Sequence, residues 1–410
     1  MTDPTHDPER TSWVKPANDP GAQFPIQNLP FGSFRQRGED RARLGVAIGD
    51  MVFDVGQAYG IASMAAVMSM RRAARVDLRR HISDFLARYI ERADRYLVPM
   101  SEVTLLLPCE IPDYTDFFTS LDHATNVGSM FRPGNPLSPN YKWMPIAYHG
   151  RASSVVISGT PIRRPRGQVL TEPSGAPVFA PCRQLDYEIE LGAFIGPGNE
   201  MGHPIPAAEA EEHLFGVCLL NDWSARDIQS WESQPLGPFL SKNFGTSISP
   251  WIVTLEALEP FRCPARPRAE KDPRPLPYLD VMGAGAFRIS MEVWLRSPKL
   301  PEAVNISRGD FSSMYWTLAQ MVSHHASNGC PLRPGGLIGS GTVSGPEKQN
   351  RGCLLEMTER GSVPLQLPNG EARTFLEDGD EVILRGWCQA PGFHAIGLGE
   401  CRGAILPAWD

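Results

Sequence analysis

A short stretch of strictly alternating residues constrains the fold of this chain more than any other feature of its sequence. From Leu185 to Leu191, apolar residues alternate with acidic ones, and a period of two is typical of a half-buried β-strand. Side chains two apart in a strand share a face, so Asp186, Glu188 and Glu190 are expected to lie together. Two interpretations fit this face. It is the solvated side of an edge strand, or it is a wall of a site for a hard cation, which prefers carboxylate oxygens.

The turn-forming residues predict many short elements elsewhere in the chain. The 410 residues include 38 glycines and 39 prolines, and in the C-terminal three quarters these separate strand-like apolar runs. Helical patterns are few there, at about 207–214, 223–231 and 311–327. We therefore expect a mainly β (α+β) protein, and its length favours two domains over a single core.

Composition divides the chain into three regions. Residues 1–23 are rich in Pro, Asp and Thr and have almost nothing to bury, so we expect a disordered tail. Residues 24–107 contain no cluster of His, Cys or acids and predict a small α+β domain with a packing or regulatory task. Pro108 and Pro112 mark its end, and residues 108–410 are expected to form a β-rich domain that carries the chemistry.

Two elements of the first domain are predicted from local pattern. Short apolar runs on either side of Gly49-Asp50 indicate a tight hairpin. Apolar residues recur at helical spacing over residues 73–97, with arginines on the opposite side, which predicts the clearest amphipathic helix in the chain.

Charge and cysteine usage exclude several classes of protein. The net charge is −7 and the basic residues are scattered, which argues against a nucleic-acid partner. The eight cysteines are also scattered and form no CxxC pair, so reduced thiols are expected rather than a disulfide framework or a zinc site. No apolar run resembles a signal peptide or reaches membrane-spanning length. The sequence predicts a soluble cytoplasmic protein without a membrane partner.

Four segments of the second domain carry polar side chains that are unusual in a hydrophobic core. They run from Asp113 to Arg132, from Tyr148 to Arg151, along the acidic stretch, and from Asn221 to Gln229, with Lys242 and Thr246 further on. His123 lies among small and polar residues, and histidine changes charge near neutral pH, which suits a general base. Asp222 follows an apolar run, where a helix cap would also favour aspartate. Together these segments supply oxygen ligands, a base and cationic donors, which is what adding water to a carbonyl requires.

Short strings spread along the chain are more specific than any single residue. They include PIQNLPFG, GVAIGD, DYTDF, HATNVG, YHGRASS, LDYEIEL, NDWSARDIQ, PLGPFL, SGT and FLEDGDEVI. In this order, from about Phe24 to Pro407, they resemble the fumarylacetoacetate hydrolase family. The resemblance implies a small SH3-like N-terminal barrel, a C-terminal mixed β-sandwich roll and a homodimer.

The resemblance also implies roles for individual residues. The metal ligands would be Asp116, Glu188, Glu190 and Asp222, with Lys242 and Thr246 beside a Mg²⁺ position. An ammonium cannot ligate a cation, so Lys242 would contribute its backbone carbonyl. The substrate contacts would be Phe118, Arg132, Tyr148, Gln229, Ser233 and Thr342, where Phe118 and Ser233 replace family tyrosines. The proton acceptor would be His123, oriented by Glu356, with Arg226, Gln229 and Lys242 stabilising the oxyanion.

The reaction that the resemblance implies is hydrolysis of the carbon–carbon bond of 4-fumarylacetoacetate to fumarate and acetoacetate, the last step of tyrosine and phenylalanine degradation. Ca²⁺ or Mg²⁺ would be the cofactor. One alternative is a related acylpyruvate or diketo-acid hydrolase, or a 2-oxo-acid decarboxylase, hydratase or isomerase of the same superfamily. These usually lack the N-terminal domain and the HATNVG and YHGRAS strings. Another is a non-catalytic cation-binding module, which would not need His123 and Glu356 together.

Overall fold

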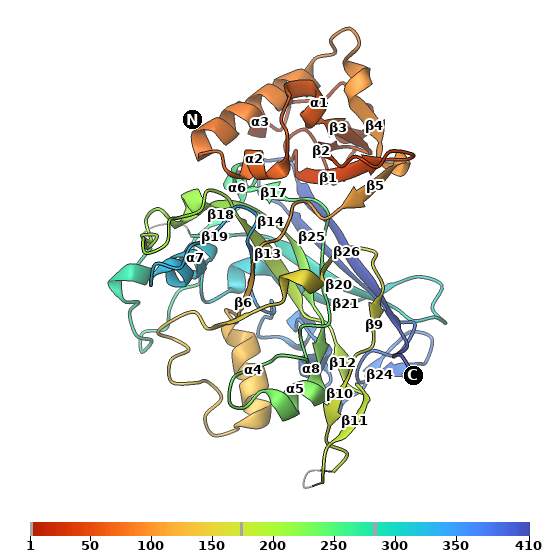
Figure 1. Ribbon diagram of the computed structural model, residues 1–410, viewed down its shortest axis with the longest axis vertical. Helices are drawn as coiled ribbons and strands as arrows, with labels where there is room; N and C mark the ends of the chain where they lie inside the picture. Colours follow the sequence, from red (N-terminus) through yellow and green to blue (C-terminus); the bar gives the residue numbers. More distant parts are fainter. Residues whose placement is uncertain (1–2, 173–174, 282–284) are drawn as a thin grey trace.

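The chain folds into a small N-terminal unit and a larger C-terminal one, which lie at opposite ends of the molecule in Figure 1. This computed structural model describes residues 3–172, 175–281 and 285–410. Both units are built around β-sheets, so the prediction of a mainly β fold with a small N-terminal and a β-rich C-terminal domain is confirmed. Within those ranges, every helix is too short or too polar to cross a membrane.

The N-terminal unit is a five-stranded antiparallel sheet with the strand order β4-β3-β2-β1-β5. Its strands are β1 (Phe31–Gln36), β2 (Arg43–Ile48), β3 (Met51–Asp54), β4 (Leu97–Pro99) and β5 (Val103–Leu106). Three helices follow β3, namely α1 (Val55–Tyr59), α2 (Met64–Met68) and α3 (Arg72–Ala87). Gly49-Asp50 joins β2 to β3, with Gly49 at a φ of +58°, so the predicted hairpin is confirmed.

The helix predicted over residues 73–97 ends ten residues earlier than its pattern suggested. α3 ends at Ala87, and the chain then forms a 3₁₀ turn (Ala93–Tyr96) before β4. Leu97, which continues the helical periodicity, pairs instead with Phe53 in the sheet. The strand pairing outweighs the local helical pattern, because it supplies the backbone hydrogen bonds and a place in the core together.

The prediction of a disordered tail is wrong for residues 3–23. This segment contains two 3₁₀ turns, Pro4–His6 and Lys15–Asn18. Val14 and Ala17 lie in the core of the N-terminal unit, and the ring of buried His6 contacts the Glu256 carbonyl at 2.8 Å. A few well-placed apolar side chains therefore anchor a segment whose average composition resembles disorder.

The C-terminal unit contains a mixed eight-stranded sheet that carries the candidate site. Seven strands follow the order β7-β6-β22-β13-β14-β16-β8, and β17 pairs with β14. The bounds are β6 (Tyr114–Phe117), β7 (Ala147–His149), β8 (Val155–Ile157), β13 (Ile189–Ile195), β14 (Leu214–Asp222), β16 (Thr246–Ile248), β17 (Val253–Thr254) and β22 (Leu337–Gly339). The pairs β22–β6 and β16–β8 are parallel, whereas the central pair β13–β14 is antiparallel.

A second sheet of five strands packs on the first, in the order β21-β20-β25-β26-β9. Its strands are β9 (Ile162–Arg163), β20 (Ser290–Arg296), β21 (Val304–Asp310), β25 (Glu381–Cys388) and β26 (Ile396–Leu406). Leu191 and Leu219 of the first sheet share one hydrophobic core with Val293 and Leu384 of the second. The two sheets therefore form a sandwich with a common apolar interior.

The remaining strands form two-stranded ladders, and most helices are short. The ladders are β10 (Arg166–Val169) with β11 (Val178–Pro181), β12 (Leu185–Asp186) with β15 (Ser224–Ala225), β18 (Arg262–Cys263) with β19 (Ala286–Phe287), and β23 (Leu365–Gln366) with β24 (Ala372–Arg373). The helices are α4 (Leu121–Phe131), α5 (Arg226–Glu232), α6 (Leu255–Leu258), α7 (Leu318–Ala326) and α8 (Leu354–Met357).

The three helices predicted in this unit are all shorter than expected. The pattern over 223–231 yields only α5, because Ser224 and Ala225 are extended and pair with β12. The pattern over 311–327 yields α7, which begins only after the Thr317 capping box. The pattern over 207–214 yields a single 3₁₀ turn before β14 begins.

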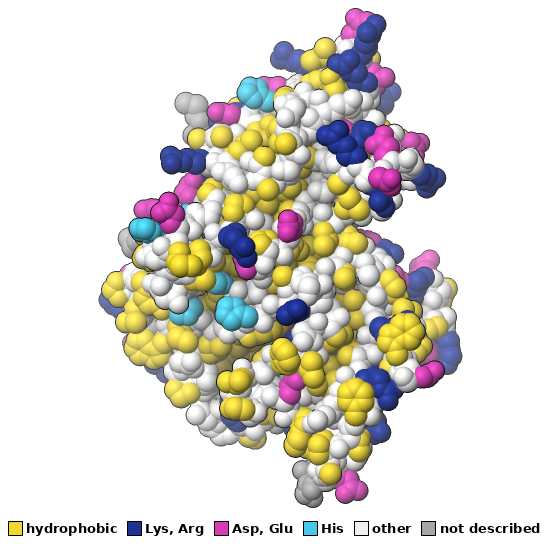
Figure 2. All heavy atoms as spheres, in the orientation of Figure 1, with side chains coloured by type: hydrophobic (Ala, Val, Ile, Leu, Met, Phe, Trp, Pro, Cys, Tyr) yellow, Lys and Arg dark blue, Asp and Glu magenta, His cyan; other side chains and the backbone are white. Residues whose placement is uncertain are grey.

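The surface agrees with the scattered charge of the sequence. On the face shown in Figure 2, basic and acidic side chains stand beside one another over the N-terminal unit. The eight cysteines, all within the described ranges, are free thiols, as expected.

Candidate active site

The acidic stretch that the alternation predicted as one strand is broken in two. Residues 185–186 form β12 and residues 189–195 form β13, with Tyr187 and Glu188 between them. The prediction of a half-buried strand is wrong, because this whole stretch is buried and β13 lies inside the sheet between β14 and β22. The interpretation as a solvated edge face fails for the same reason. The acids must therefore be balanced by protein groups or by a cation.

Three carboxylates from one sheet meet at a point, and we call them the carboxylate cluster. Asp116 lies on β6, Glu190 on β13 and Asp222 at the end of β14. One oxygen of each lies within 4.8 Å of an oxygen of the others, and all three side chains are buried. The sheet brings together residues far apart in sequence, because β22 pairs with both β6 and β13, and β13 pairs with β14.

Two oxygens of the carboxylate cluster have no partner among the described protein groups. Asp116 Oδ1 and Glu190 Oε1 are buried, and no described residue donates a hydrogen bond to either. Burial and the nearby Asp222 raise the pKa of Asp116 well above its ordinary value, and burial and Asp116 do the same to the pKa of Glu190. Unpaired carboxylate oxygens at this spacing are the ligands that Ca²⁺ and Mg²⁺ prefer. The residues present therefore fit a divalent cation.

Hydroxyl groups surround the same carboxylates. The Tyr148 hydroxyl lies 2.8 Å from Asp222 Oδ2 and 3.1 Å from Asp116 Oδ2. Tyr114, which the sequence did not single out, donates to Asp116 Oδ2 at 3.2 Å. Thr246 Oγ1 is 3.5 Å from Asp222 Oδ1. Tyr148 and Thr246, both predicted site residues, thus reach the carboxylate cluster.

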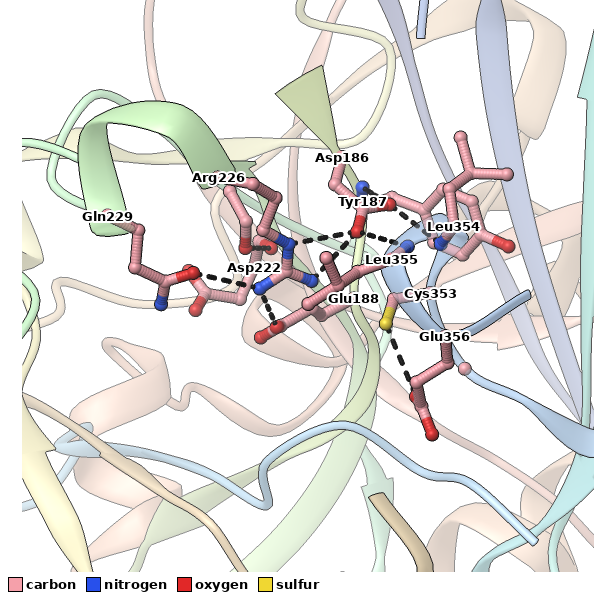
Figure 3. A network of polar contacts seen from close by, with 12 residues as sticks. Asp186, Tyr187, Glu188, Asp222, Arg226, Gln229, Cys353, Leu354, Leu355 and Glu356 are labelled. Atoms are coloured by element: carbon pink, nitrogen blue, oxygen red, sulfur yellow. Dashed lines mark hydrogen bonds and ion pairs between the residues drawn. The ribbon is translucent and has the colours of Figure 1, made fainter. Parts of the chain in front are cut away.

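Two buried cations lie beside the carboxylate cluster. Lys242 Nζ is 2.6 Å from both Asp222 Oδ2 and Glu188 Oε2. Arg226 Nη1 is 2.7 Å from Glu188 Oε1, as Figure 3 shows. Burial alone would raise the pKa of Glu188, but Lys242 and Arg226 hold it well below its ordinary value. Burial alone would lower the pKa of Lys242, but Asp222 and Glu188 raise it, so the ammonium stays charged. Glu188 is not one of the three residues of the carboxylate cluster, and Lys242 and Arg226 contact its two oxygens.

His123 and Glu356 form a buried pair. His123 lies in the first turn of α4, and its Nδ1 is 2.6 Å from Glu356 Oε2 on α8. Burial opposes ionisation of Glu356, but His123 lowers the pKa of Glu356 to about 2, so the carboxylate accepts the Nδ1 proton. The Nε2 lone pair then remains for an incoming proton, which is the arrangement of a general base held by a carboxylate. His123, after Lys242 and Arg226, also contributes to the low pKa of Glu188.

Three further side chains hold Glu356, and the sequence did not single them out. Asn126 Nδ2 donates to Oε1 at 2.8 Å, whereas Ser344 Oγ and Cys353 Sγ donate to Oε2 at 2.8 and 3.2 Å. Asn126 lies one turn after His123 on α4, a helix that the sequence pattern did not predict. His123, Cys353 and Glu356 are joined by hydrogen bonds, since His123 Nδ1 and Cys353 Sγ both contact Glu356 Oε2.

One predicted substrate contact packs against His123, and a second is buried without a hydrogen-bond partner among the described residues. The ring of Phe118 packs edge-on against His123, with centroids 5.2 Å apart. Thr342 is buried, and its hydroxyl has no hydrogen-bond partner among the described residues. An unpartnered buried hydroxyl is a ready contact for a ligand oxygen.

The other predicted contacts lie further from the carboxylate cluster. Gln229 Oε1 accepts a hydrogen bond from Arg226 Nη1 at 3.2 Å (Figure 3), and the Ser233 hydroxyl donates to the Gln229 backbone carbonyl. Arg132, at the end of α4, is exposed and donates to the Pro136 carbonyl at 3.0 Å. The structure thus places Gln229 beside a buried cation but does not bring Arg132 into the buried site.

Two glycines allow the carboxylates to approach the sheet. A Cβ at Gly339, on β22, would lie 2.5 Å from Asp116 Oδ1 and 3.0 Å from Glu190 Oε2. Gly341 has a φ of +77°, and its N–H donates to Glu190 Oε2 at 2.9 Å. Neither glycine was predicted as a site residue, although SGT, at residues 340–342, is one of the matching strings.

The fold and the site together define a class of protein. A two-domain β protein with buried carboxylates, a His–Glu pair and two buried cations in one place has the composition of an enzyme that activates water beside a divalent cation. The family model described as fumarylacetoacetate (FAA) hydrolase C-terminal matches residues 114–406, and that described as fumarylacetoacetase N-terminal matches residues 27–108. The chain therefore belongs to the fumarylacetoacetate hydrolase family.

Relatives from animals and plants match nearly the whole chain. It is 47% identical to the fumarylacetoacetase of Homo sapiens over 422 residues, which cover 97% of this chain and 99% of the relative. It is 46% identical to the fumarylacetoacetase of Bos taurus over 420 residues, which cover 97% of this chain and 99% of the relative. It is 47% identical to the fumarylacetoacetase of Arabidopsis thaliana over 411 residues, which cover 94% of this chain and 96% of the relative.

Solved structures support the fold at much lower identity. Fumarylacetoacetate hydrolase from psychrophilic Exiguobacterium antarcticum has a TM-score of 0.54 at 19% identity, covering 92% of this chain and 99% of that one. Maleylpyruvate hydrolase from Sphingobium sp. SYK-6, in complex with manganese (II) ion and pyruvate, has a TM-score of 0.52 at 16% identity, with coverage of 93% and 100%.

Proposed function

We propose that this protein is a metal-dependent hydrolase that cleaves the carbon–carbon bond of 4-fumarylacetoacetate to fumarate and acetoacetate. The observation that carries the proposal is the meeting of the carboxylate cluster, two buried cations and the His123–Glu356 pair in one site. The relatives named fumarylacetoacetase, which match both units, support this substrate and a place in tyrosine and phenylalanine degradation.

The carboxylate cluster would hold the cation, with Glu188, Thr246 and the backbone carbonyl of Lys242 as further proposed ligands. The unpaired Asp116 Oδ1 and Glu190 Oε1 support this site. When bound, Ca²⁺ or Mg²⁺ would polarise the dicarbonyl oxygens of the substrate. The manganese (II) complex of maleylpyruvate hydrolase agrees with a divalent cation in this fold.

His123 would act as the general base. Its Nε2 takes a proton from water as the water oxygen adds to the carbonyl carbon, while Glu356 holds the Nδ1 proton and stabilises the imidazolium. The carbon–carbon bond then breaks, and its electron pair moves to the acetoacetate part as an enolate. The imidazolium returns its proton to that part, so the products are fumarate and acetoacetate.

Arg226 and Lys242, with Gln229, would stabilise the negative charge that develops. Arg226 Nη2 pairs with Asp186 Oδ2 at 2.9 Å and Nη1 with Glu188 Oε1 at 2.7 Å, so the guanidinium is held in one orientation beside Glu188. Preorganised donors of this kind each contribute roughly 2.7–4 kcal/mol to transition-state stabilisation.

The substrate itself would contact Phe118, Arg132, Tyr148, Gln229, Ser233 and Thr342. The guanidinium of Arg132 has the planar fork that suits a carboxylate, although it must turn from its contact with Pro136 to reach the site. Phe118 and Ser233 offer fewer polar contacts than the tyrosines of the family, which favours a related acylpyruvate or diketo-acid hydrolase as the second candidate.

A substrate panel tests the proposal. The purified protein, supplied with Ca²⁺ or Mg²⁺, is assayed on fumarylacetoacetate beside acylpyruvates and oxaloacetate, and fumarate is detected directly. Preferred cleavage of fumarylacetoacetate with fumarate release is the expected result. Preference for an acylpyruvate would favour the second candidate, and cation binding without turnover of any diketo acid would contradict both.

We also propose that the protein acts as a homodimer in the cytoplasm on a small-molecule diketo acid. The family resemblance supports the dimer, and the free thiols of all eight cysteines are compatible with a reducing compartment. Light scattering behind size-exclusion chromatography tests the dimer, which would be contradicted by a mass close to the 45.2 kDa of one chain.

A further inference from the structure

Asp186 is a buried acid to which the proposed reaction assigns no task. Its side chain is 0% exposed, and it lies at the end of β12, just before the chain leaves the strand. It does not belong to the carboxylate cluster. Figure 3 shows where it lies instead, between Arg226 on one side and the backbone of Leu354 and Leu355 on the other.

Protein donors use both oxygens of Asp186 fully. Oδ1 accepts the backbone N–H groups of Leu354 at 2.8 Å and Tyr187 at 2.9 Å. Oδ2 accepts the backbone N–H of Leu355 at 2.9 Å and the Nε–H of Arg226 at 2.9 Å. A carboxylate offers about four acceptor positions, so these four donors leave none for a cation or a substrate.

The hydrogen-bond partners of Asp186 lie beside the proposed base pair, His123 and Glu356, and include the proposed oxyanion donor, Arg226. Leu354 and Leu355 directly precede Glu356, whose carboxylate holds the Nδ1 proton of the base. On the other side, Arg226 reaches Glu188 at 2.7 Å and carries the donors proposed to stabilise the oxyanion. The Asp186 carboxylate therefore bonds both to the backbone next to Glu356 and to the Arg226 guanidinium, which is proposed to stabilise the oxyanion.

We propose that Asp186 is a positioning residue for the reaction, which fixes the distance between the Arg226 guanidinium and the Glu356–His123 pair. The inference rests on the proposed function, since it assumes that the two groups act on one substrate. Asp186 touches neither substrate nor cation. Its loss should therefore lower kcat and leave KM and cation affinity nearly unchanged.

The first test is Asp186→Asn. The amide keeps one acceptor oxygen, but its nitrogen faces two donors that cannot bond to it. These are the Leu354 and Tyr187 N–H groups if the nitrogen takes the place of Oδ1, or the Leu355 N–H and Arg226 Nε–H if it takes the place of Oδ2. Since hydrogen bonds to charged groups are worth more than neutral ones, we expect kcat to fall about 10- to 100-fold, with KM within about threefold of wild type. Calorimetry with Ca²⁺ should show the wild-type dissociation constant.

Asp380→Asn is the matched control. Asp380 is also 0% exposed and accepts hydrogen bonds from Arg373 at 2.9 and 3.0 Å and from the Glu377 backbone at 2.9 Å, but none of its partners belongs to the site. This variant should lose thermal stability and keep the wild-type kcat. An equal loss of kcat in both variants would show that Asp186 serves stability alone and would overturn the proposal.

A double-mutant cycle separates positioning from an independent effect. If Asp186 acts partly through Glu356, then Asp186→Asn should cost clearly less in a Glu356→Gln background than in wild type, because residues that act as a unit are not additive. The same fold loss in both backgrounds contradicts the proposal. If the asparagine variant does not fold, Asp186→Glu replaces it in the test. The glutamate keeps the charge but moves Arg226 away from α8, so the kcat of this variant must still fall.

The two proposals fail in different ways. A wild-type protein that does not cleave fumarylacetoacetate contradicts the proposed function. An active wild type with an equally active, folded Asp186→Asn variant contradicts only the positioning role.

Discussion

Replacing Gly339 with alanine disturbs the cation site without removing a ligand. The added Cβ would lie 2.5 Å from Asp116 Oδ1 and 3.0 Å from Glu190 Oε2, whereas ordinary contacts begin at 3.4 Å, so Asp116 must move by most of an ångström. Metal sites tolerate distance errors of only about 0.2 Å. Changes in the support of ligands commonly weaken metal binding about 10- to 100-fold, and we expect a loss of that size for Ca²⁺ and Mg²⁺.

Isothermal titration calorimetry on EDTA-stripped protein measures this loss, and thermal unfolding shows whether the variant is folded. Gly309→Ala on β21 is the matched control, because its Cβ would meet nothing closer than 3.6 Å. It should bind cations as wild type does and gain about 0.4–1 kcal/mol of stability. A folded Gly339→Ala protein with wild-type cation affinity would refute the assignment of Asp116 and Glu190 as ligands.

Three further predictions concern the cation, the base and the buried ammonium. Chelation with EDTA should abolish turnover and added Ca²⁺ or Mg²⁺ should restore it, whereas cleavage that persists without cations would contradict the role of the carboxylate cluster. His123→Ala should abolish turnover while calorimetry still detects cation binding, and near-normal turnover would end its assignment as the base. Lys242→Met should lower the free energy of unfolding in urea by about 3–5 kcal/mol, because it removes the ammonium from two buried acids and leaves Asp222 without a cation. Unchanged stability would show that the ammonium does not balance these acids.

The local sequence pattern predicted the presence of these elements better than the residues at which they begin and end. The hairpin at Gly49-Asp50 depends on turn chemistry within a few residues, and it is present as expected. The helix predicted over 73–97 ends early because Leu97 pairs with a strand more than forty positions back in the sequence. Packing of Val14 and Ala17 into the core likewise orders a segment whose composition indicated disorder. Contacts of this kind are not encoded in any short window.

The same limit applies to the candidate site. Alternation located the acidic stretch and its apolar face, but it could not show that Asp186 turns toward Leu354 and Arg226 rather than toward the other acids. His123 and Glu356 lie 233 positions apart, and only the family resemblance paired them. Asn126 lies one turn after His123, but on α4, a helix that the pattern did not predict, and Ser344 and Cys353 had no local signal.

The central claim is that acids from separate strands converge on one divalent cation beside His123. Anomalous diffraction from crystals soaked with Mn²⁺ tests it most directly. The account predicts one strong peak within about 2.6 Å of oxygens of Asp116, Glu190 and Asp222. A peak elsewhere in the molecule, or none at a Mn²⁺ concentration that supports turnover, would contradict it.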